Sequence, residues 1–429
     1  MTDIHGHVYA DKSVVNVQDF SFAESNGGRY IAKGGMKLDD SKQLFGVLDV
    51  TNGSVKNLLA LLDRADEHLD GQLNGSVELG GTKDNPSVIV NGKINDVTID
   101  DKVVGDATID ASLANRKFKI TTLKLPVGEG LIAMGGTLDL DGQADLQVAL
   151  KDVDIVPFLP LVGKDIQATG WVTGVVNVTG ETKNPKVELS GAVESGSFNG
   201  IGIDEGFALA TMQDHVIQIQ RIQGAKGGYK LSIYGKIPLA ALYTSGYLEA
   251  SDAKSMDVTI DFNEADMAVI PLVTTSVKDA TGPLKGAIRL TGTIDQPEAY
   301  GTVSVRNGTM KLANVDNEIT GIDGDLIFSG QQGDFQSRIN MGKGSAGLAA
   351  KVNWSGHELT NYKAAVQLDG LDVRSEYVRG PLNGELYIVE RDGLPTLIGN
   401  LDLENIQFKI PLSLQSSESS TNMGVDVNI

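Results

Sequence analysis

The 429-residue sequence contains no cysteine, only 12 prolines and five histidines, and few aromatic residues, at 5%. The absence of cysteine excludes disulfides, thiolate metal sites and a cysteine nucleophile. No stretch approaches the roughly 18 apolar residues that a membrane-spanning helix requires. The net charge of −20 disfavours binding to nucleic acids and to anionic lipid surfaces. What remains to be explained is an abundance of glycine.

Motifs for catalysis are also missing. The sequence has no His-Glu-x-x-His, Gly-x-Ser-x-Gly or phosphate-binding Gly-rich motif, so zinc peptidase, serine hydrolase and nucleotide hydrolase chemistry lack support. His5 and His7 are better interpreted as part of a frayed end than as a metal site. The acidic segment 139–145 resembles a calcium loop but lacks its closing glutamate, and a hairpin turn explains it better. We therefore predict a protein that is not an enzyme and has no metal site and no cofactor.

The 51 glycines accompany a strict alternation of apolar and polar residues along most of the chain. On either side of Asp141 and Gly142, for example, leucine and valine take one parity while aspartate, glutamine and lysine take the other. This pattern is typical of antiparallel strands with one apolar and one solvated face, joined here by a tight turn. The sequence predicts an all-β fold.

A long internal repeat is the most informative feature. Gly-x-Leu/Val-x-Gly followed by alternating Leu, Val or Ile begins at Gly71, Gly170, Gly282 and Gly380. Each copy ends in a proline at the same distance from its second glycine, namely Pro86, Pro185, Pro297 and Pro395. The repeat is roughly a hundred residues long. The spaced glycines permit curvature or close approach of another segment, and the proline marks a strand-ending turn.

A short apolar segment without alternation precedes the repeats. Residues 55–63 have helical spacing with Ser54 as N-cap, whereas residues 153–162 and 267–273 contain proline, and residues 371–377 are nearly polar. We expect one short helix or irregular crossing segment per repeat, packed on the apolar face. The expected boundaries are 1–65 (partial repeat), 66–165, 166–277, 278–375 and 376–429 (partial repeat), all within one continuous groove.

The motif Gly-x-Leu-x-Gly-x-Val-x-Leu-x-Gly-Thr-x-Asp-Asn-Pro of residues 71–86, with its upstream apolar segment, resembles the repeat of the TamB family. These are envelope proteins of diderm bacteria, related to AsmA-like and bridge-like lipid transfer proteins. The resemblance covers all four copies. The family's N-terminal inner-membrane anchor and the C-terminal region thought to meet the outer-membrane barrel TamA were not identified, so we expect an internal fragment.

The resemblance implies an elongated, curved antiparallel repeat sheet that forms a trough (a β-taco, or repeating β-groove) with short helical crossing segments. It further implies a periplasmic bridge, anchored in the inner membrane in the full-length protein, that carries phospholipid acyl chains between the two membranes and supports outer-membrane biogenesis. The implied partners are phospholipid and a TamA-like (Omp85-type) barrel. Two alternatives stay open: a scaffold for assembling outer-membrane proteins such as autotransporters, and a dry β-solenoid structural protein or adhesin.

Alternation is also what a dry sandwich or solenoid core requires, and taken without the resemblance it favours such a core over an open groove. Because a one-residue slip would turn every side chain to the opposite face, parity within each strand identifies the candidates for the groove. The candidate lining residues are Val77, Leu79, Val88, Val90, Leu138, Leu140, Leu146, Val148, Leu150, Val176, Val178, Ile288, Leu290, Leu386 and Ile388.

Overall fold

The computed structural model describes residues 2–61, 68–100, 102–159, 167–198, 201–227, 229–242, 255–272, 274, 276–375, 378–391, 394–403, 405–408 and 424–428. Residues 1–199 and 205–214 form one compact unit (unit 1), and residues 200–204 and 215–429 form another (unit 2). Strand β13 (Ile201–Gln213) contributes to both.

The other strands of unit 1 are β1 (Thr2–Ala10), β2 (Val14–Ala23), β3 (Arg29–Lys37), β4 (Leu44–Ser54), β5 (Leu69–Gly81), β6 (Pro86–Ile99), β7 (Lys102–Ala114), β8 (Lys117–Val127), β9 (Gly130–Asp139), β10 (Gln143–Asp154), β11 (Ala168–Glu181) and β12 (Lys186–Phe198). Its helical segments are α1 (Val55–Leu61) and the 3₁₀ turn η1 (Val156–Phe158).

The strands of unit 2 are β14 (Val216–Lys226), β15 (Tyr229–Pro238), β16 (Met256–Glu264), β17 (Val277–Thr281), β18 (Leu284–Gly292), β19 (Pro297–Leu312), β20 (Glu318–Gly330), β21 (Gln332–Met341), β22 (Gly344–Ser355), β23 (Glu358–Arg374), β24 (Val378–Arg391), β25 (Leu394–Asp402), β26 (Gln407–Phe408) and β27 (Gly424–Asn428). Its helical segments are α3 (Leu239–Leu242) and η2 (Met267–Leu272).

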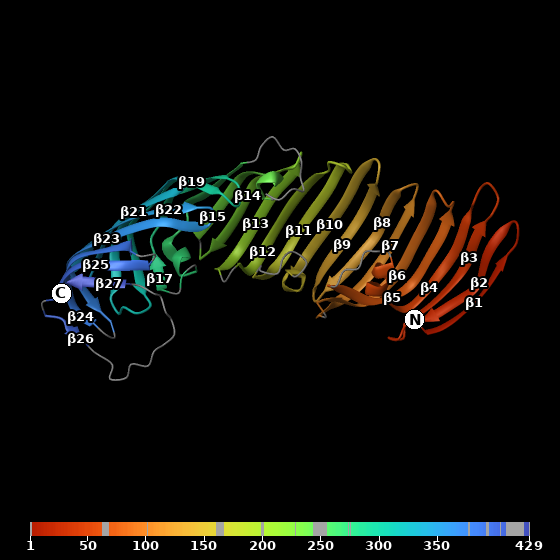
Figure 1. The fold of residues 1–429 in the computed structure, drawn as a ribbon, viewed down its shortest axis with the longest axis horizontal. Coiled ribbons are helices and arrows are strands. Elements are labelled where there is room, and N and C mark those ends of the chain that lie inside the picture. Colours follow the sequence, from red (N-terminus) through yellow and green to blue (C-terminus); the bar gives the residue numbers. More distant parts are fainter. Residues whose placement is uncertain are drawn as a thin grey trace. The chain divides into compact units, whose positions relative to one another are not determined.

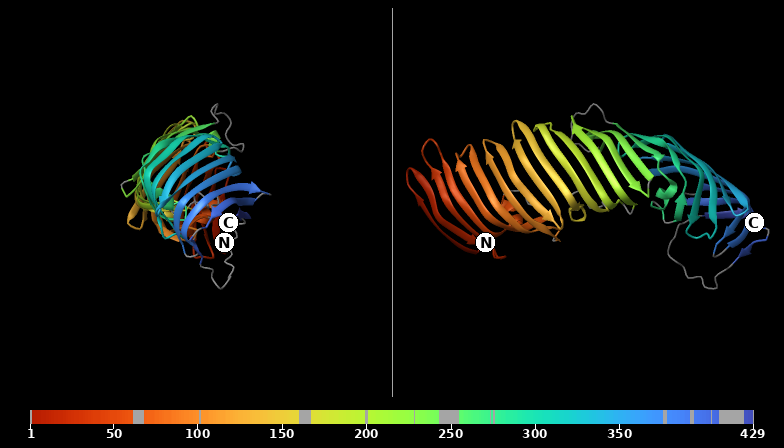
Figure 2. Two further views of the ribbon diagram at one scale, coloured as in Figure 1. Left: turned by 90° about the vertical axis from the view of Figure 1, so that its left-hand side faces the viewer. Right: turned by 180° about the vertical axis from the view of Figure 1, so that it is seen from behind.

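The described residues are thus almost entirely strand, in one long open sheet, and the all-β prediction is confirmed. From β1 to β12 each strand pairs antiparallel with the next strand in the sequence, and Figures 1 and 2 show them side by side in chain order. Unit 2 departs from this rule in several places. β16 pairs with β18, and β17 and β18 pair with different halves of β19. β26 pairs with β24, and β27 pairs with β25 in parallel.

The motif glycines allow close approach of the neighbouring strand. A Cβ on Gly286 would lie 1.9 Å from the carbonyl oxygen of Thr302, and its φ of +125° is unfavourable for other residues. Gly384, its counterpart in the next copy, has φ +137° and would place a Cβ 2.1 Å from the carbonyl oxygen of Asn400. The prediction that these glycines permit curvature or close approach is confirmed.

The motif's asparagine and proline form the expected turn. The N–H of Asn85 donates to the carbonyl of Thr82 at 3.2 Å, and the N–H of Thr82 donates back at 3.0 Å. The side-chain amide of Asn85 also donates to Asn115 Oδ1 in the neighbouring turn, at 2.7 Å. Pro86 then begins β6, and Pro297 begins β19 in the same way.

The helix expected over residues 55–63 forms as α1, which lies against β4 and β5. Ser54 is its N-cap as predicted, because its hydroxyl accepts the N–H of Asn57 at 3.1 Å. Glu24 ties this end of α1 to the sheet by accepting the Tyr30 hydroxyl at 3.0 Å, the Ser54 N–H at 3.2 Å and the Asn57 amide at 3.0 Å. Burial and the hydrogen bond to Glu24 raise the pKa of the Tyr30 hydroxyl.

The two proline-containing segments, η1 and η2, are attached by one shared arrangement. The N–H groups of Ile155 and Met267 donate to the carbonyls of the motif glycines Gly170 and Gly282, at 3.2 and 2.8 Å. One residue earlier, Asp154 Oδ1 accepts the N–H of Val156 at 3.0 Å, and Asp266 Oδ1 accepts that of Ala268 at 2.9 Å. The first glycine of the motif thus anchors the crossing segment that precedes it.

The fourth expected crossing segment does not follow this pattern. Residues 371–374 are the end of β23, and Leu371 is buried. Leu371, Asp372 and Val373 alternate within β23, beyond a register shift between Leu368 and Leu371, and this alternation favours strand over helix. The expectation of one crossing segment per repeat is therefore wrong for residues 371–374, while α3 is a helical segment that the sequence did not predict.

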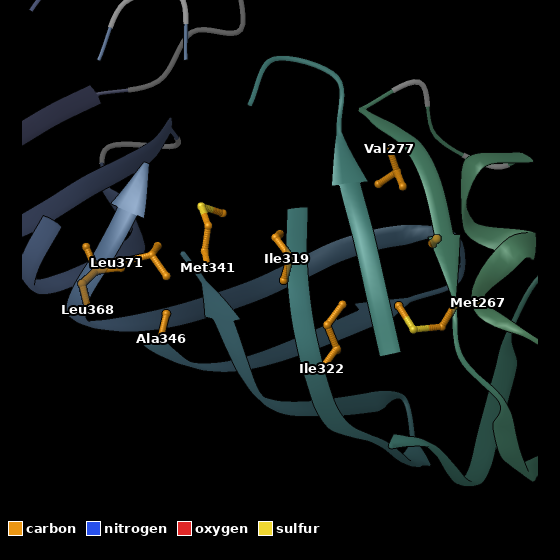
Figure 3. Close-up of a cluster of buried hydrophobic side chains, with 9 residues drawn as sticks. Met267, Val277, Ile319, Ile322, Met341, Ala346, Leu368 and Leu371 are labelled. Carbon is orange, nitrogen blue, oxygen red and sulfur yellow. The ribbon is translucent and has the colours of Figure 1, made fainter. Parts of the chain in front are cut away.

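The main packed core lies in unit 2 (Figure 3). Met267 of η2 is buried there together with residues of the facing strands, among them Ile319, Ile322, Met341 and Leu371. A smaller cluster joins Ala241 of α3 to Met256, Val258 and neighbouring half-buried residues. In unit 2 the helical segments therefore pack on the apolar side of the sheet.

We predict that Asp266→Ala destabilises unit 2 by about 1–3 kcal/mol. Asp266 is only 3% exposed, and its second carboxylate oxygen accepts the N–H of Gly282 at 2.9 Å. The substitution would leave two N–H groups without their acceptor and loosen η2 from the sheet. Chemical denaturation followed by circular dichroism measures the effect. Asp279→Ala, at an exposed position on β17, is the control and should change stability by less than about 0.5 kcal/mol.

Candidate functional site

One face of unit 1 carries the predicted lining residues. In an antiparallel pair, residues directly opposite each other point to the same face. Val77 lies opposite Val90, and Leu79 lies opposite Val88. Leu48 of β4 lies opposite Val77 on its other side, so this face extends toward the first strands.

The same face continues through β7–β11, although the pairs β7–β8, β8–β9 and β10–β11 each contain a register shift. Val90 lies opposite Ala111, which lies opposite Ile120. Gly136 of β9 lies opposite Ile120 of β8 on one side and opposite Leu146 of β10 on the other. The register places on one face all the candidates of unit 1 except Leu140, that is Val77, Leu79, Val88, Val90, Leu138, Leu146, Val148, Leu150, Val176 and Val178.

Leu140 lies in the turn between β9 and β10 and is 37% exposed. The turn begins one residue earlier than the alternation suggests, because Asp139 Oδ1 accepts the N–H of Asp141 at 3.1 Å. The hairpin around Asp141 and Gly142 forms as predicted, with the Arg116 guanidinium paired to Asp141. That hydrogen-bonded pair lowers the pKa of Asp141.

The candidates in unit 2 lie on apolar rows of their own sheet. Ile288 lies opposite Ile260, and Leu290 lies opposite Val258. Leu386 lies opposite Val366, and Ile388 lies opposite Ala364. Leu290 packs against the smaller cluster of unit 2, and Leu386 packs against its main core. These two side chains therefore already contact protein.

Burial distinguishes the two units. None of the 15 candidates is fully buried: Leu79 is 40% exposed, Leu140 is 37% exposed, and the others are half-buried. Both clusters of buried hydrophobic side chains found among the described residues lie in unit 2. The apolar face of unit 1 is thus lined with Val, Leu and Ile that the described part of the chain leaves partly accessible.

A hollow of about 800 Å³ opens on this face over β1–β6. It is lined by the candidates Val77, Leu79 and Val88 and by further residues that were not predicted. The sequence did indicate some of these further residues, because Val15-x-Val17 and Leu44-x-Gly46-x-Leu48 show the same alternation. The additional lining residues include Val8, Val15, Val17, Phe20, Ala32, Met36, Leu44 and Leu48.

The opposite face of the sheet is polar. Ser76, Asn91 and Asp110 follow one another across β5, β6 and β7. In unit 2, Arg289 binds Asp257 through two hydrogen bonds of 2.7 and 2.9 Å, which lower the pKa of that carboxyl group. On these strands the sheet therefore separates an apolar row from a polar, solvated row.

β-Bulges end the half-buried rows. Asn52, Asp96 and Asp152 adopt left-handed backbone conformations with φ near +50°. The N–H of Asp152 donates to Thr173 Oγ1 of the next strand at 3.0 Å, and the other two are satisfied similarly by Asn74 and Asp106. Beyond the bulge, Val153 lies opposite Val172 and is only 2% exposed. These bulges were not predicted, although each contains an Asn or Asp that interrupts the alternation.

A comparison with protein-family models supports the resemblance. The model described as TamB C-terminal domain matches residues 220–405, which lie within unit 2. This segment is similar to the TamB family.

The match is to the C-terminal domain of the TamB family, the region that the sequence analysis did not locate. No curated protein and no solved structure matches the chain. TamB is in general a non-catalytic family. Among the described residues, no helix is long and apolar enough to cross a membrane.

Proposed function

We propose that the chain is part of a periplasmic bridge whose apolar face carries phospholipid acyl chains between the inner and outer membranes. The observation that carries the proposal is the row of half-buried Val, Leu and Ile across unit 1, over which the described residues place no packed core. Apolar surface left in water costs roughly 25 cal/mol per Å², so hydrocarbon on this row would be stabilised. The similarity of residues 220–405 to the TamB family supports the same function.

The residue types of this row favour movement of an acyl chain along it over binding of the chain at one fixed position. The row consists of Val, Leu, Ile and small residues such as Ala111 and Gly136, without polar groups that would fix a headgroup in place. Contacts of this kind are non-directional, so one position of an acyl chain is about as favourable as the next. The polar face of the sheet would meanwhile contact the periplasm.

The similarity to the TamB family also supports a proposal for the partners and the location. We propose that the full-length protein is anchored in the inner membrane and works with a TamA-like outer-membrane barrel. Assembly of outer-membrane proteins would then depend on the same bridge. A scaffold without lipid, or a dry β-solenoid, would leave the apolar row without any bound hydrocarbon.

The test is site-specific photo-crosslinking in cells at two adjacent positions. Val90 lies on the apolar row, whereas Ile89 is 41% exposed and lies opposite Glu78 on the polar face. With benzoylphenylalanine at each position, we expect lipid adducts by mass spectrometry at position 90 and at least about tenfold fewer at position 89, because only position 90 faces hydrocarbon. Equal labelling at both positions, or no lipid at either, would contradict the proposal.

A further inference from the structure

Unit 2 contains a second apolar hollow, of about 310 Å³, between the β14–β15 hairpin and η2. Ile222, Leu231 and Ile233 line it from the hairpin, and Ala268 and Val269 line it from η2. Their neighbours in η2, Met267 and Ile270, instead pack on the core shown in Figure 3. The core therefore holds η2 in place over the hollow.

The volume suits a single hydrocarbon chain. Ligand pockets typically measure about 300–1,000 Å³, and an engineered apolar cavity of roughly 150 Å³ holds benzene. A hollow of 310 Å³ can therefore take an extended stretch of one acyl chain but not two chains side by side. Its lining is almost wholly apolar, so water in it would find few hydrogen-bonding partners.

The mouth of the hollow is polar. Lys226 and Tyr229 lie opposite each other at the end of the hairpin, and both line the hollow. By parity Lys226 shares the face of Ile222 and Gly224, so a cation ends an otherwise apolar row. Both mouth side chains are exposed, and none of the ion pairs found in the described part of the chain involves Lys226. The nearby Asp204 carboxylate accepts the N–H of Gly227 at 2.7 Å.

We propose that this hollow is a fixed binding site for one acyl chain of an anionic amphiphile. The chain lies between the hairpin and η2, and the headgroup phosphate or carboxylate binds the Lys226 ammonium and the Tyr229 hydroxyl. A lysine stem packed along apolar surface with its charged end in water is a common way to meet such a headgroup. The inference rests on the acyl-chain function proposed above and adds a site with headgroup preference, which the row of unit 1 lacks.

The test uses the whole chain and two photoactivatable probes with the same sixteen-carbon chain, palmitate and hexadecanol, each carrying a diazirine. Peptide mapping should place the label of both probes on η2. Lys226→Gln should lower palmitate labelling there about fivefold, while hexadecanol labelling changes little, because only the carboxylate uses the cation. Lys236→Gln is the matched control, since Lys236 is exposed on the opposite face of β15 and should leave both labels unchanged.

A second variant tests the hollow itself. Ile222 is 37% exposed, so Ile222→Trp should be accommodated and should fill the space, removing both labels from η2 while the row of unit 1 remains labelled. Equal palmitate labelling of the Lys226 and Lys236 variants would overturn the headgroup site. Competition by millimolar inorganic phosphate as effective as that by unlabelled palmitate would mean a free-anion site and would also overturn it. Label in unit 1 but none on η2 refutes only this site, whereas no label anywhere refutes the acyl-chain function.

Discussion

Val148→Asp should leave unit 1 folded and abolish its contact with lipid. Val148 is half-buried on the apolar row, opposite Met134 and Val176. Where water reaches the introduced carboxylate, the substitution should lower the free energy of unfolding of unit 1 by only about 1 kcal/mol. For a unit of this size this corresponds to a decrease of a few degrees in Tm. Against an acyl chain the same carboxylate would be unpaired in hydrocarbon, which costs several kcal/mol and blocks passage.

The matched control lies on the same strand. Val153, beyond the bulge at Asp152, is 2% exposed, and Val153→Asp would bury a charge without a partner. We expect a loss of about 3–5 kcal/mol and partial or complete unfolding of unit 1.

Thermal unfolding by circular dichroism, limited proteolysis and lipid photo-crosslinking at position 90 separate the outcomes. If acyl chains pass along the apolar row, the Val148 variant should stay folded and should no longer yield lipid adducts. If the variants at 148 and 153 unfold to the same extent, the row is a dry core and the proposed function is wrong. If the folded Val148 variant still crosslinks lipid as the parent does, lipid does not pass along this row.

Gly286→Ala should destabilise unit 2 by about 3 kcal/mol or more. The added Cβ would lie 1.9 Å from the carbonyl oxygen of Thr302, which is backbone and cannot move aside without shifting β19. The φ of +125° adds strain of its own for any side chain. Because this glycine recurs in every copy of the motif, the experiment tests a property of the repeat.

The control for this substitution has the opposite expected sign. A Cβ on Gly347 of β22 would meet nothing within 4 Å, and its backbone conformation is ordinary for a strand. Gly347→Ala should be neutral or stabilise unit 2 by up to about 1 kcal/mol, because alanine loses less backbone entropy on folding. Denaturant titration of the two variants measures both effects, and a similar loss in each would show that close approach at Gly286 is not what requires glycine.

Period two was sufficient to predict the all-β fold and the hairpin at Asp141 and Gly142. The register that places Val77 opposite Val90 follows from burying the same parity on both strands. The Ser54 N-cap was predictable because a cap is local in sequence.

Other features depend on atoms far apart in the sequence. The bulge at Asp152 is stabilised by Thr173 of the next strand, and the turn at Leu140 depends on Asp139 and on the Arg116–Asp141 pair. Alternation cannot indicate how accessible a row of side chains is to solvent. Val148 and Val153 are both valines of β10, yet Val148 is half-buried and Val153 is buried. The hollow beneath η2 likewise depends on a crossing segment whose position is set by the core of unit 2.

The pairing of each strand with its sequence neighbour also bears on how such a protein folds and lengthens. Nearly every strand pair in unit 1 is closed by a short turn, so the entropy lost in forming it is small and folding can proceed strand by strand as the chain emerges during synthesis. A duplicated repeat inserted at a motif proline would add strands between existing neighbours and leave the other pairings unchanged. Length could therefore evolve in steps of one repeat, each step adding the same set of strands to the sheet.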